Sequence, residues 1–328
     1  MEKNCEVFNI TGRLDKKSFI NKANQKEERV ILVKSFREIG VMNCILIATI
    51  IFLWISVFFI NGLIGAYAWA LLKMILPILG ICGVFINIFL FIFCLVKRKK
   101  YNKLLVNFIL NLVLIFPILM TMNIIQFIYP IDIERVEPSI TIKWPFAEET
   151  IVVWGGDSIK DNLIHVTWPS ERWAYDLVME PYDIGSKNNE EYGIWDKKVY
   201  SPISGVVIAA YDGEKDIDPG SEDFTLLEGN HVYIKVDETG TYLLLNHLKE
   251  DSVTVKEGDR VNPGDVIGRI GNSGSTSEPH LHIHHQRQDP TKVLHPILAE
   301  GLPLYFEGIN GEAMPKKGDI ILPDTLIN

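Results

Sequence analysis

Four histidines stand within six residues near the carboxyl end of the chain, in the stretch "EPHLHIHHQ": His280, His282, His284 and His285. The alternating pattern there is typical of a strand, so the first three imidazoles share one face and the fourth points to the other. Neighbouring positions on one face are about 6.6–7 Å apart, so two of these imidazoles can converge on one small site. Neutral imidazole is the commonest metal ligand. The run therefore predicts a metal site rather than a polar strand face exposed to water, although His284 taken alone could be only structural.

The distribution of histidine and cysteine limits the ligands that such a site can use. All eight histidines lie between His165 and His295. The four cysteines all lie in the amino-terminal half of the chain: Cys5, Cys44, Cys82 and Cys94. Residues 130–328 can therefore form neither a disulfide nor a thiolate metal site. A metal bound there must be held by imidazole and carboxylate groups.

Short strands separated by turns are predicted to position these histidines. Residues 201–216, "SPISGVVIAAYDGEKD", indicate turn, strand and turn. Residues 229–248, "GNHVYIKVDETGTYLLLNHL", indicate two strands joined at "DETG", a hairpin signal. Residues 253–274 alternate very short strands with tight turns. Long helical periodicity is absent, so we expect a compact all-β domain in the carboxyl-terminal part.

Three uncharged apolar runs precede this domain, at residues 41–60, 74–96 and 104–128. Each is about 20 residues or longer, which is enough for a helix to cross a hydrocarbon core of about 30 Å. A buried hairpin of soluble helices is the alternative, but such helices are rarely apolar all round. The first run starts too far from Met1 for a cleavable signal peptide. We therefore expect a three-helix transmembrane region whose partner is the lipid bilayer.

Basic residues predict the orientation of these helices. Residues 97–103, "KRKKYNK", hold five basic residues and no acid, and residues 1–40 hold nine basic and six acidic residues. Lys and Arg gather on the cytoplasmic side. Both segments then lie on the cytoplasmic side of a multi-pass membrane protein, and everything after about Tyr129 lies on the outer side. Lys73 falls near the outer end of the second run, where its amine could reach the headgroups.

The predicted extracytoplasmic part is strongly acidic. Residues 130–328 hold 35 acidic and 17 basic residues, a net charge of −18, whereas residues 1–129 carry +9. An acidic surface repels phosphate backbones, so we expect no nucleic acid as a partner.

Several motifs together resemble one family. "VYSPISGVVI", "GNHVYIK", "LLLNHLKEDSVTVKEGDRVNPGDVIGRIGNSG" and "EPHLHIH" follow one another as in the lysostaphin/LytM-type zinc endopeptidases, over roughly residues 145–300. The resemblance implies a duplicated hybrid motif domain, a small antiparallel β-sheet or sandwich with a groove. It also implies Zn²⁺ at the groove floor and hydrolysis of peptide bonds in cell-wall peptidoglycan. Residues 301–328 are expected to be a carboxyl-terminal tail.

The resemblance assigns roles to four residues. In the family's H-x-H motif the second histidine binds zinc, which is His282 here, and the first is catalytic, which is His280. A further catalytic histidine ends an earlier strand, and "LLLNHL" supplies His247. The aspartate of the first motif is a second zinc ligand, and "RWAYDLV" supplies Asp176.

The first motif departs from the family pattern at its other end. The family has a histidine four residues before the aspartate, but Arg172 stands there. Arginine stays protonated and has no lone pair for a metal. Either another histidine has taken over, or the site is dead. Arg172 itself could pair with an acid in the cleft, bind a substrate carboxylate, or lie on the surface beside Trp173.

His165, in "DNLIHVTWPSERWAYD", is the best candidate for the missing ligand. It lies eleven residues before Asp176, and Pro169 between them allows a turn. The segment also resembles a branch of the family in which an N-x-H element precedes the aspartate motif, although Asn162 stands one place further away. His231 is a weaker substitute. We therefore expect His165, Asp176 and His282 to hold zinc.

Two rival interpretations belong to other classes. The half-barrels of lipoyl and biotinyl carrier domains have similar turns, but they need a lysine at an exposed hairpin tip, and none stands there. A catalytically inactive LytM-type scaffold that binds cell wall or partner proteins would be expected to have lost several site residues. We predict a membrane-anchored zinc endopeptidase acting on peptidoglycan, with the inactive scaffold as the alternative.

Overall fold

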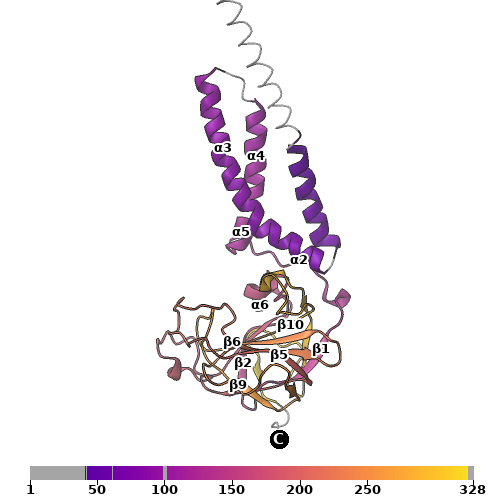
Figure 1. Ribbon diagram of the computed structural model, residues 1–328, viewed down its shortest axis with the longest axis vertical. Helices are drawn as coiled ribbons and strands as arrows, with labels where there is room; N and C mark the ends of the chain where they lie inside the picture. The colour runs from indigo at the N-terminus through magenta and orange to yellow at the C-terminus, as the bar shows by residue number, and fades with distance from the viewer. Residues whose placement is uncertain (1–40, 42, 61, 99–101, 324–328) are drawn as a thin grey trace, which may run out of the picture. The chain divides into compact units, whose positions relative to one another are not determined.

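The computed structural model describes residues 41–323 except 42, 61 and 99–101, and these residues divide into two compact units. One unit contains the residues up to Phe52 together with Leu76–Phe116, and the other contains Leu53–Ile75 and everything from Pro117 onward. The first unit is helical. The second contains short helices and all the strands (Figure 1).

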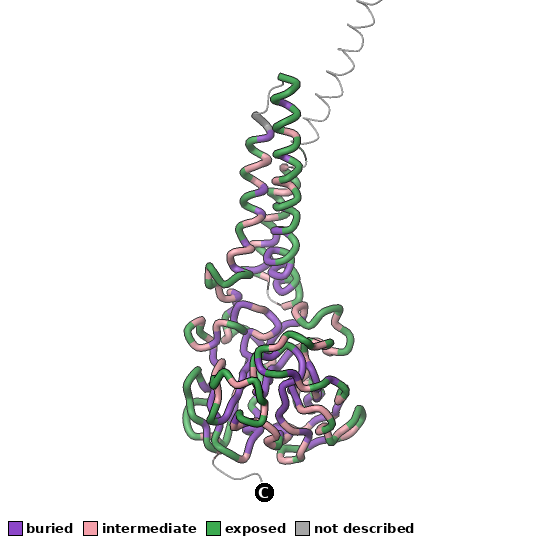
Figure 2. Tube along the Cα trace, turned by 90° about the vertical axis from the view of Figure 1, so that its left-hand side faces the viewer, coloured by how far each residue is buried: buried purple, intermediate pink, exposed green. Residues whose placement is uncertain are grey.

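Helices α3 (Leu76–Val96) and α4 (Asn102–Ile115) pack against each other in the helical unit. Gly80 allows the close approach, because a Cβ atom there would lie 2.8 Å from the Asn111 carbonyl oxygen. Most large apolar side chains on these helices point outward, and Phe85 and Phe89 are each 69% exposed. Figure 2 shows this contrast between exposed helices and the buried strands of the sheet.

Two described helices, not the three expected, are long and apolar enough to cross a membrane: Leu63–Val96 and Leu104–Thr121. The first joins α2 (Leu63–Ala70), a π-helical turn η1 (Leu71–Ile75) and α3, so it begins well before the expected residue 74. The expected run at 41–60 contains the apolar helix Asn43–Phe59, which falls short of 18 residues.

The last expected span, 104–128, is wrong at its end. The helix ends at Thr121, the last residue of α5 (Ile118–Thr121), and the chain turns at Asn123, whose φ is 54°. Phe127 then packs against Trp54 and Trp69, with ring centroids 6.4 and 5.9 Å away. Hydropathy cannot distinguish an apolar residue in such a cluster from one in a spanning helix, which is why the sequence overestimated this helix.

The carboxyl-terminal part is mostly sheet, as predicted. Nine strands form one sheet in the order β13-β2-β3-β10-β7-β6-β5-β8, with β11 also on β10. Their bounds are β2 Thr150–Trp154, β3 Tyr175–Val178, β5 Gly205–Tyr211, β6 Asn230–Val236, β7 Tyr242–Leu248, β8 Arg260–Val261, β10 Leu281–Gln286, β11 Gly301–Leu302 and β13 Ile320–Ile321. All the pairings in this sheet are antiparallel.

Two smaller sheets complete the strands. Strand β1 (Ile140–Lys143) pairs in parallel with β12 (Leu304–Glu307), and β4 (Lys198–Tyr200) pairs with β9 (Val266–Arg269). The remaining elements are short helices: η2 Ile133–Arg135, α6 Ile159–Val166, η3 Asn189–Glu191 and η4 Pro296–Leu298. The expected hairpin joins β6 to β7 and closes with the Val236 amide donating to the Thr241 carbonyl at 2.8 Å.

One continuous apolar core fixes the central strands. Val232, Leu245 and Ile283 are each fully buried and belong to this core, and they come from β6, β7 and β10. Because strand side chains alternate between faces, burying these residues turns His282 and Asn246 to the opposite face of the sheet. The polar face produced in this way forms the floor of a cleft.

Candidate metal centre and catalytic cleft

The cleft has a volume of about 860 Å³ and is lined by strands β2, β3, β6, β7 and β10 and the loops around them. This size is in the range of ordinary ligand pockets. Register places three polar side chains in one row across its floor. His282 on β10 is the cross-strand partner of Asp176 on β3 and of Asn246 on β7. Directly paired side chains on one face lie within contact distance, so the sheet itself brings these groups together.

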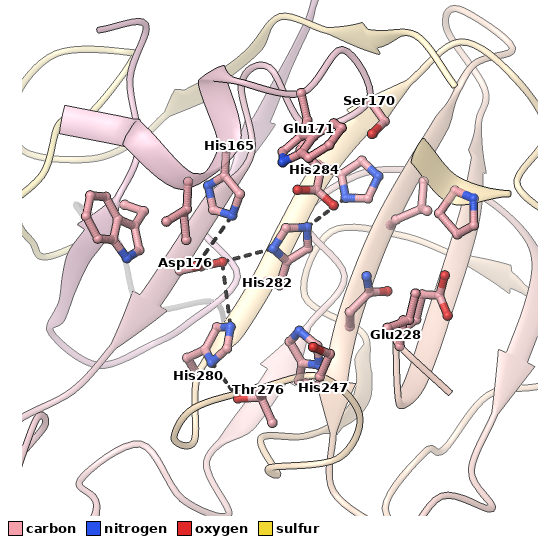
Figure 3. Close-up of a pocket in the computed structure, with 18 of the residues that line it drawn as sticks. His165, Ser170, Glu171, Asp176, Glu228, His247, Thr276, His280, His282 and His284 are labelled. Carbon is pink, nitrogen blue, oxygen red and sulfur yellow. Dashed lines mark hydrogen bonds and ion pairs between the residues drawn. The ribbon is translucent and has the colours of Figure 1, made fainter. Parts of the chain in front are cut away.

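Three of the predicted site residues form a buried cluster: His165, Asp176 and His282. Their potential ligand atoms all lie within 4.8 Å of one another. His282 Nδ1 is 2.9 Å from Asp176 Oδ1, and His165 Nε2 is 3.5 Å from Asp176 Oδ2 (Figure 3). Two imidazoles and one carboxylate are a donor set found in catalytic zinc sites, so these residues fit that metal.

The charges in the cluster favour an ionised carboxylate. Burial alone would raise the pKa of Asp176, but the neighbouring histidines His165, His280 and His282 hold it well below its usual range. Burial lowers the pKa of His165 to about 4. Burial is also the largest single effect at His282 and acts in the same direction, but the Asp176 carboxylate together with the charges of Glu171 and Glu228 outweighs it and raises the pKa of His282. An anionic carboxylate beside imidazole lone pairs is suited to a cation.

His165 reaches the cluster because hydrogen bonds of one buried side chain, Asn162, hold α6 in place. Asn162, fully buried, donates from Nδ2 to the carbonyls of Gly156 and Ala174, each at 3.0 Å. Its Oδ1 lies 2.8 Å from His165 Nδ1. A carbonyl-type oxygen only accepts, so His165 carries its proton on Nδ1, and the bare Nε2 faces Asp176.

A second support comes from the helical segment before α3. The Trp69 indole donates to the Thr167 carbonyl at 2.8 Å, and the Lys73 amine donates to the same oxygen at 3.2 Å. Lys73 also lies over the Trp168 ring, 3.7 Å from its centroid. The lysine is only 2% exposed, so the expectation that its amine reaches the headgroups is wrong. The two donors hold the chain just after His165.

His247 and His280 face each other beside the cluster, with ring centroids 4.8 Å apart. His247 Nδ1 donates to the Ser273 carbonyl and His280 Nδ1 to the Glu278 carbonyl, both at 2.8 Å. The Nε2 atom of His280 lies 3.6 Å from Asp176 Oδ1. His247 has a φ of 64°, which a non-glycine residue rarely adopts, and strain of this kind is often found at functional sites.

Three other histidines have different surroundings. His231 stacks on Tyr233, with centroids 4.2 Å apart, and does not line the cleft. His285 lies on the opposite face of β10 with both nitrogens bonded, to Thr241 Oγ1 and to the Pro303 carbonyl. His284 lies on the cleft face and contacts His282. The structure therefore brings His165, not His231, to the cluster.

Arg172 is buried outside the cleft. Its guanidinium pairs with Asp157 at 2.8 Å and donates from Nε to the Tyr129 carbonyl at 3.2 Å. It is 2% exposed, so it is neither a surface residue nor available to a substrate carboxylate. It holds the loop after α6 to the segment that leads into the sheet domain.

The polar cleft residues that the sequence analysis did not single out include Glu171, Glu228, Asn246 and Gln286. Glu171 and Glu228 project into the cleft near His282 (Figure 3). Burial raises the pKa of Glu171. Gln286 had a usable signal, because it continues the in-phase pattern of His280, His282 and His284. The two glutamates had none, since they lie in loops.

Part of the chain is similar in sequence to known peptidases. Residues 191–293 match Peptidase family M23. This match contains His247, His280 and His282, and the other two cluster residues precede it. The chain is 33% identical over 82 residues to the peptidoglycan DD-endopeptidase ShyC of Vibrio cholerae serotype O1. That alignment covers 25% of this chain, which spans only 17% of the relative's length.

Two solved structures show limited similarity to the chain. The catalytic domain of lysostaphin from Staphylococcus simulans is 20% identical, with a TM-score of 0.26, covering 39% of this chain and 73% of that one. A zinc-containing peptidase from Vibrio cholerae is 19% identical, with a TM-score of 0.30, covering 44% and 36%. The family match and the curated relative support a LytM-type peptidase domain in this part of the chain, as its motifs predicted.

Proposed function

We propose that this chain is a membrane-anchored, zinc-dependent endopeptidase that hydrolyses peptide bonds of bacterial peptidoglycan. The observation that supports this most is the buried cluster of His165, Asp176 and His282 beside two further imidazoles in an open cleft. Three protein ligands with access for a further group characterise a catalytic rather than a structural zinc site. The substrate class comes from the relative that is named a peptidoglycan DD-endopeptidase.

The cleft residues divide the chemical work. Zinc held by the cluster would polarise the scissile carbonyl and acidify a water molecule. His247 and His280 each use Nδ1 as a donor to a backbone carbonyl, so their Nε2 atoms are bare in the neutral imidazole. One can take the proton from the attacking water, and the other, once protonated, can donate to the developing oxyanion.

Metal analysis and hydrolysis together test this proposal. Purified full-length protein in detergent should hold one zinc per chain and release peptides from isolated peptidoglycan. His280→Ala should keep the zinc and lose roughly 10²- to 10⁴-fold in rate, because it removes a proton-transfer group but no ligand. His282→Ala should lose the zinc, and His231→Ala, outside the cleft, should change neither property. Parent protein without zinc would favour the inactive scaffold instead.

We also propose that helices Leu63–Val96 and Leu104–Thr121 anchor the chain as a hairpin in the bacterial cell membrane. The basic segment 97–103 between them would face the cytoplasm. Both outer ends of the hairpin then face outward, which gives the peptidase domain access to the cell wall. This arrangement agrees with an extracytoplasmic carboxyl-terminal domain.

A further inference from the structure

The cleft face of β10 carries a chain of hydrogen-bonded side chains that leads away from the metal cluster. His282 Nε2 lies 3.0 Å from His284 Nδ1, and His284 Nε2 lies 3.3 Å from Gln286 Oε1. The three positions are two apart along the strand and therefore share one face. Their exposed fractions are 6%, 6% and 2%, so water hardly competes for these contacts. None of the roles proposed above uses His284 or Gln286.

The direction of this chain can be read from its far end. Gln286 Nε2 donates to the Gln288 carbonyl at 2.7 Å, which fixes the amide so that Oε1 faces His284. An amide oxygen only accepts, so His284 Nε2 must carry a hydrogen. In a neutral imidazole the other nitrogen is then bare. His284 Nδ1 is consequently an acceptor, and His282 Nε2–H is its donor.

The last step concerns the nitrogen of His282 that faces Asp176. Because the Nε2 of His282 carries a hydrogen, Nδ1 is the nitrogen left to bind a metal. It lies 2.9 Å from Asp176 Oδ1, and a metal would replace the proton that Nδ1 shares with this carboxylate. The opposite tautomer would place an N–H where a metal must bind, and it would leave two bare nitrogens facing each other at 3.0 Å. We propose that His284 and Gln286 are positioning residues that fix His282 in the tautomer able to bind metal through Nδ1. This inference rests on the proposed zinc site.

A direct ligand role for His284 does not fit the contacts. Its Nδ1 is engaged by His282, and its Nε2 by Gln286. Among the described residues the cluster of potential ligand atoms contains only His165, Asp176 and His282. His284 could also act only by filling space. Substitutions that keep or remove the atom that accepts from His282 distinguish this role from positioning.

The first test is a matched pair at position 284. In His284→Asn, Oδ1 takes nearly the place of Nδ1 and still accepts from His282, whereas His284→Leu fills similar space without an acceptor. Zinc affinity of the full-length protein in detergent is measured by competition with a chelator. Outer-shell substitutions typically cost 10–100-fold in metal affinity, and we expect a loss of about this size for His284→Leu. His284→Asn should stay within a few-fold of the parent.

A second pair at position 286 keeps the proposal testable if a variant at 284 fails to fold. Gln286→Glu retains an oxygen that accepts from His284, and Gln286→Leu does not. Gln286→Leu should weaken zinc binding while Gln286→Glu should not, although neither side chain touches the cluster. The absorption spectrum of the cobalt-substituted protein should change with Gln286→Leu only. His231→Leu, which removes an imidazole outside the cleft, is the control.

The outcomes separate this inference from the proposed function. If folded His284→Leu and Gln286→Leu bind zinc as tightly as the parent, the inference is wrong and the zinc site stands. Equal losses in His284→Asn and His284→Leu would also refute it, because the acceptor would then be irrelevant. If the parent itself binds no zinc, the proposed function fails first.

Discussion

Asn162 offers the sharpest test of how His165 is held. Replacing it with alanine removes three buried hydrogen bonds, two donated to the carbonyls of Gly156 and Ala174 and one accepted from His165. At about 1 kcal/mol net for each bond, the free energy of unfolding should fall by about 3 kcal/mol. The imidazole also loses the acceptor that keeps its proton on Nδ1, so zinc affinity should fall roughly 10- to 100-fold.

A second substitution separates these two effects. Asn162→Asp keeps an oxygen that accepts from His165 but loses both N–H donors, so it should destabilise the fold while zinc affinity stays near that of the parent. Unfolding followed by circular dichroism and chelator competition on the same samples measure both quantities. Unchanged zinc affinity in folded Asn162→Ala would refute the view that this amide orients the ligand.

Three further predictions concern the rest of the molecule. Burial lowers the pKa of His285 to about 4 from an ordinary 6.5, so the unfolded state binds the extra proton between these values and stability should fall as pH drops from 6.5 to 4. At 1.36 kcal/mol per pH unit the loss approaches about 3 kcal/mol, and it should be smaller in His285→Gln. Removing the donors to the Thr167 carbonyl with Trp69→Phe and Lys73→Met should weaken zinc binding of the full-length protein, and unchanged affinity would mean that α6 is held by the sheet domain alone. A reporter that works only in the cytoplasm, fused after Asn328, should stay silent, and an active fusion would reverse the proposed topology.

The sequence predicted those parts of the fold that depend on neighbours along the chain. Alternation in residues 229–248 indicated the β6–β7 hairpin, because two strands and their turn are local. Alternation also placed His282 and His284 on one face of β10 and His285 on the other, as their contacts show. The chemistry of its side chain alone excluded Arg172 as a metal ligand, since a guanidinium has no lone pair in any fold.

Features that depend on distant parts of the chain could not be predicted. Trp69 and Lys73 bind a carbonyl more than ninety positions away, whereas the sequence suggested only contact of Lys73 with lipid headgroups. Phe127 continues the apolar pattern of a helix in the sequence, but in the structure it packs in an aromatic cluster, and no periodicity predicts this. The proximity of His165 to the cluster was expected from ligand number, but Asn162, which orients it, was noticed only as a loose motif match. The roles of the five site residues remain predictions.

Strand β13 follows the other described strands in the sequence, yet it supports one wall of the cleft. It pairs with β2, and the Gly318 amide donates to the Val152 carbonyl at 2.8 Å. Strand β2 in turn borders β3, which carries Asp176. When the nascent chain has been synthesised only as far as the histidines of β10, it still lacks Ile320 and Ile321. Strand β2 then has an unpaired edge. The wall of the cleft that β2 forms therefore gains its last neighbouring strand only after the strand that carries His282 has been synthesised.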